Sequence, residues 1–220
     1  MKNIIWDLDG TLIDSGKEIK QSLELALKIA GVDLEKQTKP FIVGPTIDKI
    51  IKEAFPIELI TDKILSEIIK SFREIYDNSD FEHTKPFLGI EDIIFDTKSF
   101  MHHIVTNKPD KPTKKILNKL NWTKYITSIR TPYSDFNGSK VKVQSKSEIY
   151  QCVIKKNADN VSTFLGIGDM KTDCLAAKNN NIVAIGVLWG NASKEELLDC
   201  CDYLFEDTKQ LSDFLYGWKN

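Results

Sequence analysis

Short apolar segments alternate with helical segments from about residue 87 to the end of the chain, and this alternation restricts the fold more than any other feature. The expected strands are 102–105, 126–130, 163–167, 182–187 and 203–205. The helices between them are expected to begin near Pro112, Ser145, Met170 and Ser193. A glutamate follows both Ser145 and Ser193 three residues later, which is the capping-box pattern of a helix start. Strands and helices in alternation predict a parallel sheet with helices on both faces.

The N-terminal part of the chain adds one strand and then a run of helices. Residues 3–6 form a short, mostly apolar segment that we expect to be a strand of the same sheet. Between 15 and 82, apolar residues recur at helical spacing, and Gly31 is well placed to end the first helix. The predicted fold is therefore α/β: a Rossmann-like three-layer core with a parallel sheet, residues 1–14 and 83–220, and a small α-helical cap domain, residues 15–82, inserted after the first strand.

Composition excludes several kinds of partner. The 220 residues carry 30 basic and 32 acidic side chains, so the charge gives no reason to expect a nucleic-acid polymer or a membrane surface as partner. We expect no signal peptide, no membrane span, a cytoplasmic location, and a monomer or homodimer. The four cysteines, at 152, 174, 200 and 201, form no Cys-x-x-Cys pattern, and the adjacent pair is badly placed for a bridge. Free thiols are therefore expected.

Acidic and hydroxyl side chains follow three of the expected strands. Asp7 and Asp9 come directly after the first strand, beside Gly10, where the backbone can turn sharply. Thr106 ends the second strand, and Asp169 follows the strand 163–167. Ligands of an open parallel sheet bind outside the carboxyl ends of its strands. These side chains, dispersed over the chain, are therefore expected to meet at one edge of the sheet.

The chemistry of this set indicates phosphoryl transfer. Gathered carboxylates need a cation or raised pKa values, and an all-oxygen donor set of Asp7, Asp9 and Asp169 suits Mg²⁺. The hydroxyl of Thr106 and the amide of Asn107 can donate hydrogen bonds to phosphate oxygens, and a lysine would add positive charge. Asp7 could then attack phosphorus to form an aspartyl-phosphate. Asp9 could protonate the leaving oxygen and later deprotonate a water.

These motifs, together with Gly168-Asp169-x-x-x-Asp173, resemble the haloacid dehalogenase superfamily over nearly the whole chain. The resemblance implies that Asp7 is the nucleophile and that Asp9 is the general acid/base, whose backbone carbonyl also binds the metal. It implies that Thr106 binds phosphate, and that Asp7 and Asp169 bind Mg²⁺. Asp173 is expected to support the metal from behind these ligands or through a water.

The lysine of the site is expected in the stretch 140–146. Lys146-Ser147-Glu148-Ile149 resembles the Lys-x-Glu-apolar form of the family motif, and its separation from Asp169 (169 − 146 = 23) fits one helix, a loop and one strand. The proline that commonly follows this lysine is absent. Lys146 is favoured for both catalysis and phosphate binding, and Lys142 and Lys140 remain alternatives.

Four further segments resemble the phosphoglycolate-phosphatase-like branch with an α-helical cap, namely 7–15, 43–45, 106–109 and 185–190. This resemblance implies a Mg²⁺-dependent phosphatase of a small phosphorylated metabolite: phosphoglycolate, pyrophosphate, a nucleotide or a sugar phosphate. The cap is expected to close over the site and exclude water. The loop 41–46 interrupts the helical pattern, so Phe41, Gly44 and Thr46 are expected to select the substrate.

Other functions share parts of this pattern. A phosphosugar mutase would carry the same core residues and would differ in passing phosphate between sugar positions. A 2-haloacid dehalogenase would need no metal, and the presence of Asp9, Asp169 and Asp173 argues against it. A non-catalytic relative would usually have lost one acid. A nucleotide-binding module is disfavoured because no Gly-x-Gly-x-x-Gly follows a strand. His102 and His103 are expected to be a packed or solvated pair, one on each face of their strand.

Overall fold

The computed structural model describes residues 1–131, 145–157 and 163–218. By its internal contacts the chain divides into two compact units. The sheet unit comprises Met1–Asp14 and Pro86–Asn220, and the helical unit comprises Ser15–Lys85. The strands β2 (Ile13–Asp14) and β3 (Lys85–Pro86), which pair as a two-stranded sheet, lie where the chain passes from one unit to the other.

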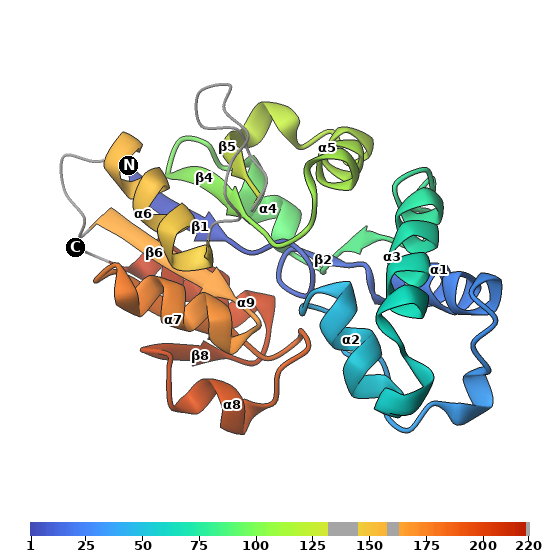
Figure 1. Ribbon diagram of the computed structural model, residues 1–220. Helices are drawn as coiled ribbons and strands as arrows, with labels where there is room; N and C mark the ends of the chain where they lie inside the picture. Colours follow the sequence, from blue (N-terminus) through green and yellow to red (C-terminus); the bar gives the residue numbers. More distant parts are fainter. Residues whose placement is uncertain (132–144, 158–162, 219–220) are drawn as a thin grey trace. The chain divides into compact units, whose positions relative to one another are not determined.

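Within the described residues, six strands form the main sheet, in the order β5-β4-β1-β6-β7-β8 (Figure 1). They are β1 (Lys2–Trp6), β4 (Phe100–Val105), β5 (Ile126–Arg130), β6 (Phe164–Gly168), β7 (Val183–Val187) and β8 (Tyr203–Phe205). Every neighbouring pair is parallel, and the register places Ile5 of β1 opposite His103 and Gly166. The predicted α/β fold with a parallel sheet is confirmed. Strand β1, which is far from the other strands in the sequence, lies between β4 and β6 in the interior of the sheet.

Most helices of the sheet unit connect its parallel strands, whereas α4 (Ile90–Phe95) precedes β4 and α9 (Thr208–Gly217) follows the last strand, β8. The connecting helices are α5 (Asp110–Lys119), α6 (Lys146–Asn157), α7 (Lys171–Asn179) and α8 (Lys194–Leu198), with a 3₁₀ turn at Thr123–Tyr125. Ser193 and Glu196 form the expected capping box at the start of α8. Ser145 and Glu148 exchange the same pair of hydrogen bonds, at 2.7 and 3.3 Å, before α6. Both helices therefore begin where local chemistry satisfies the first backbone N–H groups.

Both faces of the sheet are covered. On one face, Ile5, Phe164 and Ala184 pack with residues of α6, α7 and α8 in one apolar cluster. On the other, Phe100 contacts Tyr216 of α9, with ring centroids 5.3 Å apart. Figure 1 shows α6 and α7 in front of the strands and α4 and α9 behind them. Burying a large apolar side chain contributes roughly 1.5–3 kcal/mol, so these two layers account for much of the driving force for folding.

Because helices cover both faces of the sheet, both histidines of β4 are buried. Alternation does turn His102 and His103 to opposite faces, but neither is solvated, since both are fully buried. His102 Nδ1 accepts a hydrogen bond from Trp6 Nε1 at 3.1 Å. The His103 ring lies between Asn3 Oδ1, at 3.1 Å, and Ser128 Oγ, at 2.9 Å. They are packed core residues.

The helical unit consists of α1 (Gly16–Ile29), α2 (Ile47–Ala54) and α3 (Asp62–Tyr76), with 3₁₀ turns at Leu34–Lys36 and Ile57–Leu59. Gly31 ends α1 in the left-handed region, at φ +74°, and its N–H donates to Lys28 O. Helices α1 and α3 pack against each other, and apolar side chains on them are buried, among them Leu23, Leu27, Ile68 and Phe72. No helix within the described ranges is both long and apolar enough to span a membrane.

The expectation of four free thiols is wrong for two cysteines. Cys174 of α7 and Cys201, between α8 and β8, form a disulfide with a Cα–Cα distance of 5.5 Å. The two residues are 27 positions apart, and only the packing of α7 against the α8–β8 segment brings them together. Cys152 and Cys200 are free.

Candidate active site

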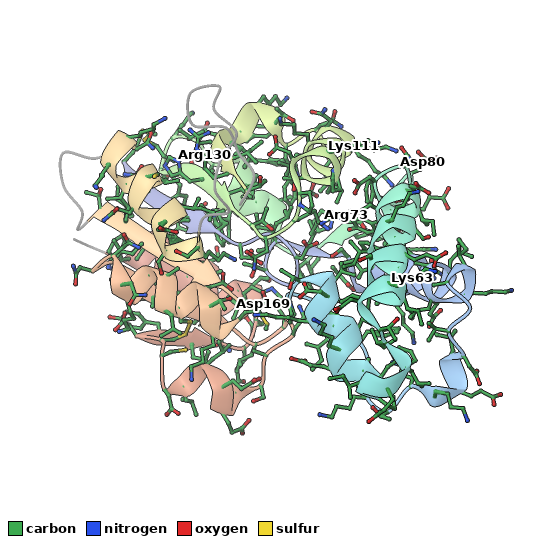
Figure 2. All side chains as sticks on the ribbon, viewed as in Figure 1. Lys63, Arg73, Asp80, Lys111, Arg130 and Asp169 are labelled. Atoms are coloured by element: carbon green, nitrogen blue, oxygen red, sulfur yellow. A yellow bond between two sulfur atoms is a disulfide. The ribbon has the colours of Figure 1, made fainter. Side chains whose placement is uncertain are left out.

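Three aspartates gather at the carboxyl ends of β1 and β6. Asp7 follows β1, and Asp173 lies in the first turn of α7. Asp169, labelled in Figure 2, follows β6. One carboxylate oxygen from each lies within 4.8 Å of the others, and all three side chains are buried. The ladder between the strands continues into the site, because Asp7 N donates to Ile167 O at 2.9 Å. The adjacency of β1 and β6 therefore brings Asp7 and Asp169 together.

A tight turn after β1 shapes the site around Asp169. Gly10 has φ +84°, and a Cβ atom there would lie 2.2 Å from Asp169 Oδ2, so glycine is required on both counts. The turn returns Thr11 toward the site, where its hydroxyl donates to Asp169 Oδ1 at 3.0 Å. Asn191 donates to Oδ2 through its backbone N–H and its side-chain amide, both at 2.8 Å. Asp169 is thus held rigidly from two sides.

Lys146 enters the site from the first residue of α6. Its Nζ lies 2.6 Å from Asp7 Oδ1 and also pairs with Asp173. The structure thus places the favoured lysine among the predicted carboxylates. The alternatives Lys140 and Lys142 lie outside the described residues.

The segment after β4 supplies a second buried cation. Lys108 Nζ lies 3.0 Å from Asp9 Oδ1, and 3% of its side chain is exposed. The backbone N–H of Lys108 donates to the hydroxyl of Thr106 at 3.1 Å, so this hydroxyl accepts there and can donate its own proton elsewhere. Thr106 is buried and Asn107 is half-buried. Phosphate-binding donors and a lysine therefore follow β4 in immediate succession.

Burial makes the carboxylates hard to ionise. It raises the pKa of Asp7 to about 7, because the nearby Lys146 only partly offsets desolvation and the repulsion of Asp173 and Asp9. Burial and the charge of Asp7 raise the pKa of Asp169 to about 6, against the hydrogen bonds from Asn191 and Thr11. Burial likewise raises the pKa of Asp173. Strongly perturbed carboxylates of this kind are typical of catalytic and metal sites.

Burial alone would lower the pKa of Lys146, but the charges of Asp173 and Asp7 outweigh it and raise this pKa. The lysine is therefore a permanent cation. Lys146 pairs with two of the three clustered carboxylates, Asp7 and Asp173, so one ammonium does not balance the negative charge that the ionised cluster would carry. Such an oxygen-rich acidic place is suited to a hard divalent cation.

A family model described as haloacid dehalogenase-like hydrolase matches residues 4–187. The chain belongs to this family. A phosphoglycolate phosphatase from Aquifex aeolicus is 29% identical over 197 residues, which cover 86% of this chain and 86% of that protein. A 5'-nucleotidase from Pseudomonas aeruginosa is 24% identical over 198 residues, covering 89% of this chain and 86% of that protein.

Solved structures agree with these matches. A predicted phosphatase from Clostridium acetobutylicum is 25% identical, with a TM-score of 0.80 over 99% of both chains. A Clostridium difficile protein is 28% identical, with a TM-score of 0.80 over 97% of this chain and 98% of that chain. This haloacid dehalogenase-like hydrolase is an enzyme of the phosphatase type.

Sequence reasoning assigned no role to three residues that contact the carboxylates of this hydrolase. Lys108 stands in the Thr106-Asn107-Lys108 motif, and its place beside Thr106 was the available signal. Asn191 follows β7 at the same edge of the sheet, one residue past the segment 185–190. Thr11 adjoins Gly10, and its role depends on the turn geometry.

The residues expected to select the substrate lie in the helical unit, directly before α2. Gly44 has φ +118°, so the loop bends where glycine is needed. Thr46 occupies the N-cap position of α2. The ring of Phe41 lies 6.3 Å from that of Phe55, and Phe41 lines a pocket of about 500 Å³ together with Lys20 and Lys39. Their role toward the carboxylate cluster stays a prediction.

Proposed function

We propose that this hydrolase is a Mg²⁺-dependent phosphatase that acts on a small phosphorylated metabolite through an aspartyl-phosphate on Asp7. The carboxylate cluster carries this proposal: Asp7, Asp169 and Asp173 lie within 4.8 Å of one another, and Nζ of Lys146 pairs with Asp7 and Asp173. A nucleophile, an acidic donor set and a fixed positive charge are the parts that phosphoryl transfer requires.

The donor set fits Mg²⁺. Its atoms are hard oxygens. The pKa of Asp7 stays raised despite the neighbouring Lys146, and that of Asp169 stays raised despite its hydrogen bonds, so the site can accept more positive charge. Asp7, Asp169 and the backbone carbonyl of Asp9 would hold the ion, with Asp173 supporting them or binding through a water. When bound, Mg²⁺ would neutralise charge on the phosphoryl oxygens.

Asp7 is oriented for attack. Lys146 donates to Oδ1, which fixes the carboxylate and leaves Oδ2 to approach phosphorus. A bond forms between Oδ2 and phosphorus while the bond from phosphorus to the leaving oxygen breaks. Thr106 and Asn107 can donate hydrogen bonds to the phosphoryl oxygens as their charge develops.

Asp9 acts as the general acid and then as the general base. Two residues after the nucleophile, it can protonate the leaving oxygen in the first step. In the second step it takes a proton from the water that attacks phosphorus, the bond to Asp7 breaks, and phosphate leaves. Lys108 holds one oxygen of Asp9 at 3.0 Å and so restricts the orientation of this acid/base group.

The substrate class follows from the relatives and from the burial of the site. Phosphoglycolate and nucleoside monophosphates are the first candidates, since the named relatives are a phosphoglycolate phosphatase and a 5'-nucleotidase. Asp7 and Asp9 are 6% and 8% exposed, which favours a small phosphoester over a phosphorylated polymer. Selection among small substrates is assigned to Phe41, Gly44 and Thr46 of the helical cap.

Phosphate release from a panel of phosphorylated metabolites tests the proposal. The purified protein should release phosphate with Mg²⁺ and lose activity in excess chelator. Asp7→Asn should abolish release, while Asp92→Asn, an exposed acid of α4, is the matched control and should change little. Turnover by Asp7→Asn close to that of the unaltered protein would refute the covalent step. Full activity in chelator would refute the metal, and phosphate passed between sugar positions would indicate a mutase.

A further inference from the structure

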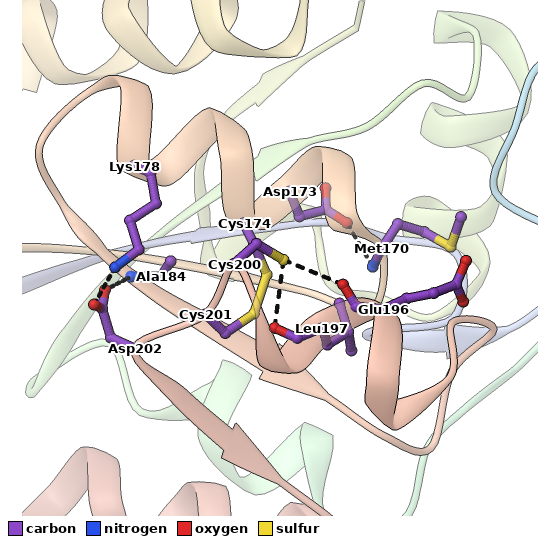
Figure 3. The surroundings of a disulfide bond; sticks show 10 residues. All are labelled: Met170, Asp173, Cys174, Lys178, Ala184, Glu196, Leu197, Cys200, Cys201 and Asp202. Carbon is purple, nitrogen blue, oxygen red and sulfur yellow. Dashed lines mark hydrogen bonds and ion pairs between the residues drawn. A yellow bond between two sulfur atoms is a disulfide. The ribbon is translucent and has the colours of Figure 1, made fainter.

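Three cysteines form a sulfur cluster on the α7 side of the sheet. The cluster consists of Cys174, Cys200 and Cys201, whose sulfur atoms all lie within 4.8 Å of one another (Figure 3). Cys174 and Cys201 are joined, and Cys200 is a free thiol beside their bond. A third sulfur next to a disulfide is chemically distinct from a plain structural bridge, because a thiol can attack either sulfur of the pair.

The surroundings of Cys200 hold its thiol at this place. Its sulfur donates to the carbonyl oxygens of Leu197, at 3.4 Å, and Glu196, at 3.6 Å (Figure 3). The residue is buried, whereas Cys201 is half-buried. Burial raises the pKa of the Cys200 thiol, so it is protonated at neutral pH and must lose its proton before it attacks.

We propose that this cluster is a thiol–disulfide exchange site, in which Cys200 can replace Cys201 as the partner of Cys174. The sulfur of Cys200 attacks that of Cys174, a Cys174–Cys200 bond forms, and the Cys174–Cys201 bond breaks. Cys201 leaves as a thiolate and takes up a proton equivalent to the one Cys200 lost. Atoms and electrons balance without an oxidant, since one disulfide and one thiol are present before and after.

Exchange changes which thiol the surroundings can reach. With Cys200 free, the thiol is buried; with Cys201 free, the thiol is half-buried and more accessible to an alkylating reagent or to a small disulfide. A small dithiol reductant, which supplies two electrons, converts either disulfide to three thiols. Cys174 directly follows Asp173 in α7, so the exchanging sulfur lies one residue from the carboxylate cluster. The proposal does not depend on phosphatase activity.

Thiol counting in single variants tests the exchange. Each protein is equilibrated with oxidised and reduced dithiothreitol in graded ratios, alkylated, and weighed by intact-protein mass spectrometry. Cys200→Ser should retain the Cys174–Cys201 bond. Cys201→Ser should form a Cys174–Cys200 bond and protect two cysteines at comparable ratios. Cys152→Ser, outside the cluster, is the matched control and should protect two cysteines as the unaltered protein does.

The proposal is overturned if Cys201→Ser stays fully reduced at ratios that oxidise Cys200→Ser, or if the unaltered protein never protects two cysteines. A second measurement needs no variant. Fragment spectra of the alkylated, digested protein identify which of the two adjacent cysteines carries the label. Label on both Cys200 and Cys201, in separate molecules, supports exchange. Label on Cys200 alone overturns it.

Discussion

The two buried histidines of β4 should make the fold sensitive to acid, and the size of this effect can be worked out. Burial lowers the pKa of both His102 and His103 from 6.5 to about 4, and in His103 the charges of His102 and Arg130 add to it. Between pH 6.5 and 4 the unfolded chain therefore binds protons that the folded chain does not. Their contribution to stability is complete above pH 6.5 and is lost as the pH falls toward 4.

The magnitude follows from the pKa difference. One pKa unit corresponds to ~1.4 kcal/mol, so at pH 5 each histidine has reduced the free energy of unfolding by ~2 kcal/mol relative to pH 7.5, and the pair by ~4 kcal/mol. The active-site carboxylates oppose this change. The pKa values of Asp7 and Asp169 are raised to about 7 and about 6, so the folded chain gains protons there as the pH falls. A comparison with variants must therefore isolate the histidines.

Glutamine is the replacement to use. His102→Gln and His103→Gln cannot bind a proton, and their amides can still bond with the partners Trp6, Asn3 and Ser128. Urea unfolding at pH 7.5 and pH 5 gives the free energy of unfolding of each protein. The loss between the two pH values should be ~4 kcal/mol smaller in the double variant than in the unaltered protein, and ~2 kcal/mol smaller in each single variant.

His83→Gln, in the helical unit, controls for the loss of an imidazole outside the sheet. The reasoning is refuted if the double variant and the unaltered protein lose the same free energy on acidification. That result would mean that the histidines take up protons in the folded state.

Three further predictions concern the site and the cap. Lys146→Ala should lower kcat by about 10²–10³, because the preorganised positive charge beside Asp7 is lost. Steady-state phosphate release measures this rate, and an unchanged rate would place the essential lysine elsewhere. Asn191→Ala removes one of the hydrogen bonds to Asp169 and should raise the Mg²⁺ concentration for half-maximal activity by roughly 10-fold in a Mg²⁺ titration; an unchanged titration curve would contradict this role. Phe41→Ala or Thr46→Ala should alter the ratio of kcat/KM between two metabolites, and a uniform drop for all substrates would show that the loop does not select.

Charge at the site is costly in the folded protein, which is a physical reason to expect coupling between metal binding and stability. Carboxylates that meet in a buried place repel one another, and Lys146 compensates only part of that repulsion. A ligand that binds the folded state and not the unfolded chain stabilises it. Mg²⁺ at this cluster would therefore be expected to raise the unfolding temperature as well as to support turnover.

Local patterns in the sequence were sufficient for the sheet and for the main acidic residues. The strands 126–130 and 203–205 have the predicted bounds, and the other predicted strands lie within two residues of theirs. Such segments are short and apolar, and the groups that follow them must meet at one edge, because parallel strands all end there. Capping boxes predicted the starts of α6 and α8, because a capping box acts between residues only three positions apart and can be read from the sequence. The pattern missed α4, which has six residues, and α9, although Asp207 caps α9 by accepting from Gln210 N at 2.8 Å.

Contacts between residues far apart in the sequence were decided by the tertiary structure alone. Lys108 faces Asp9 because β4 lies beside β1, and Asn191 reaches Asp169 because β7 lies beside β6. The bond between Cys174 and Cys201 likewise depends on how α7 packs, which no spacing of cysteines reveals. Periodicity and capping act over one or two turns of chain, whereas pairing and burial depend on which distant segments share a surface. For that reason the sequence by itself determined the elements and their chemistry, and the fold determined which charges and sulfurs became neighbours.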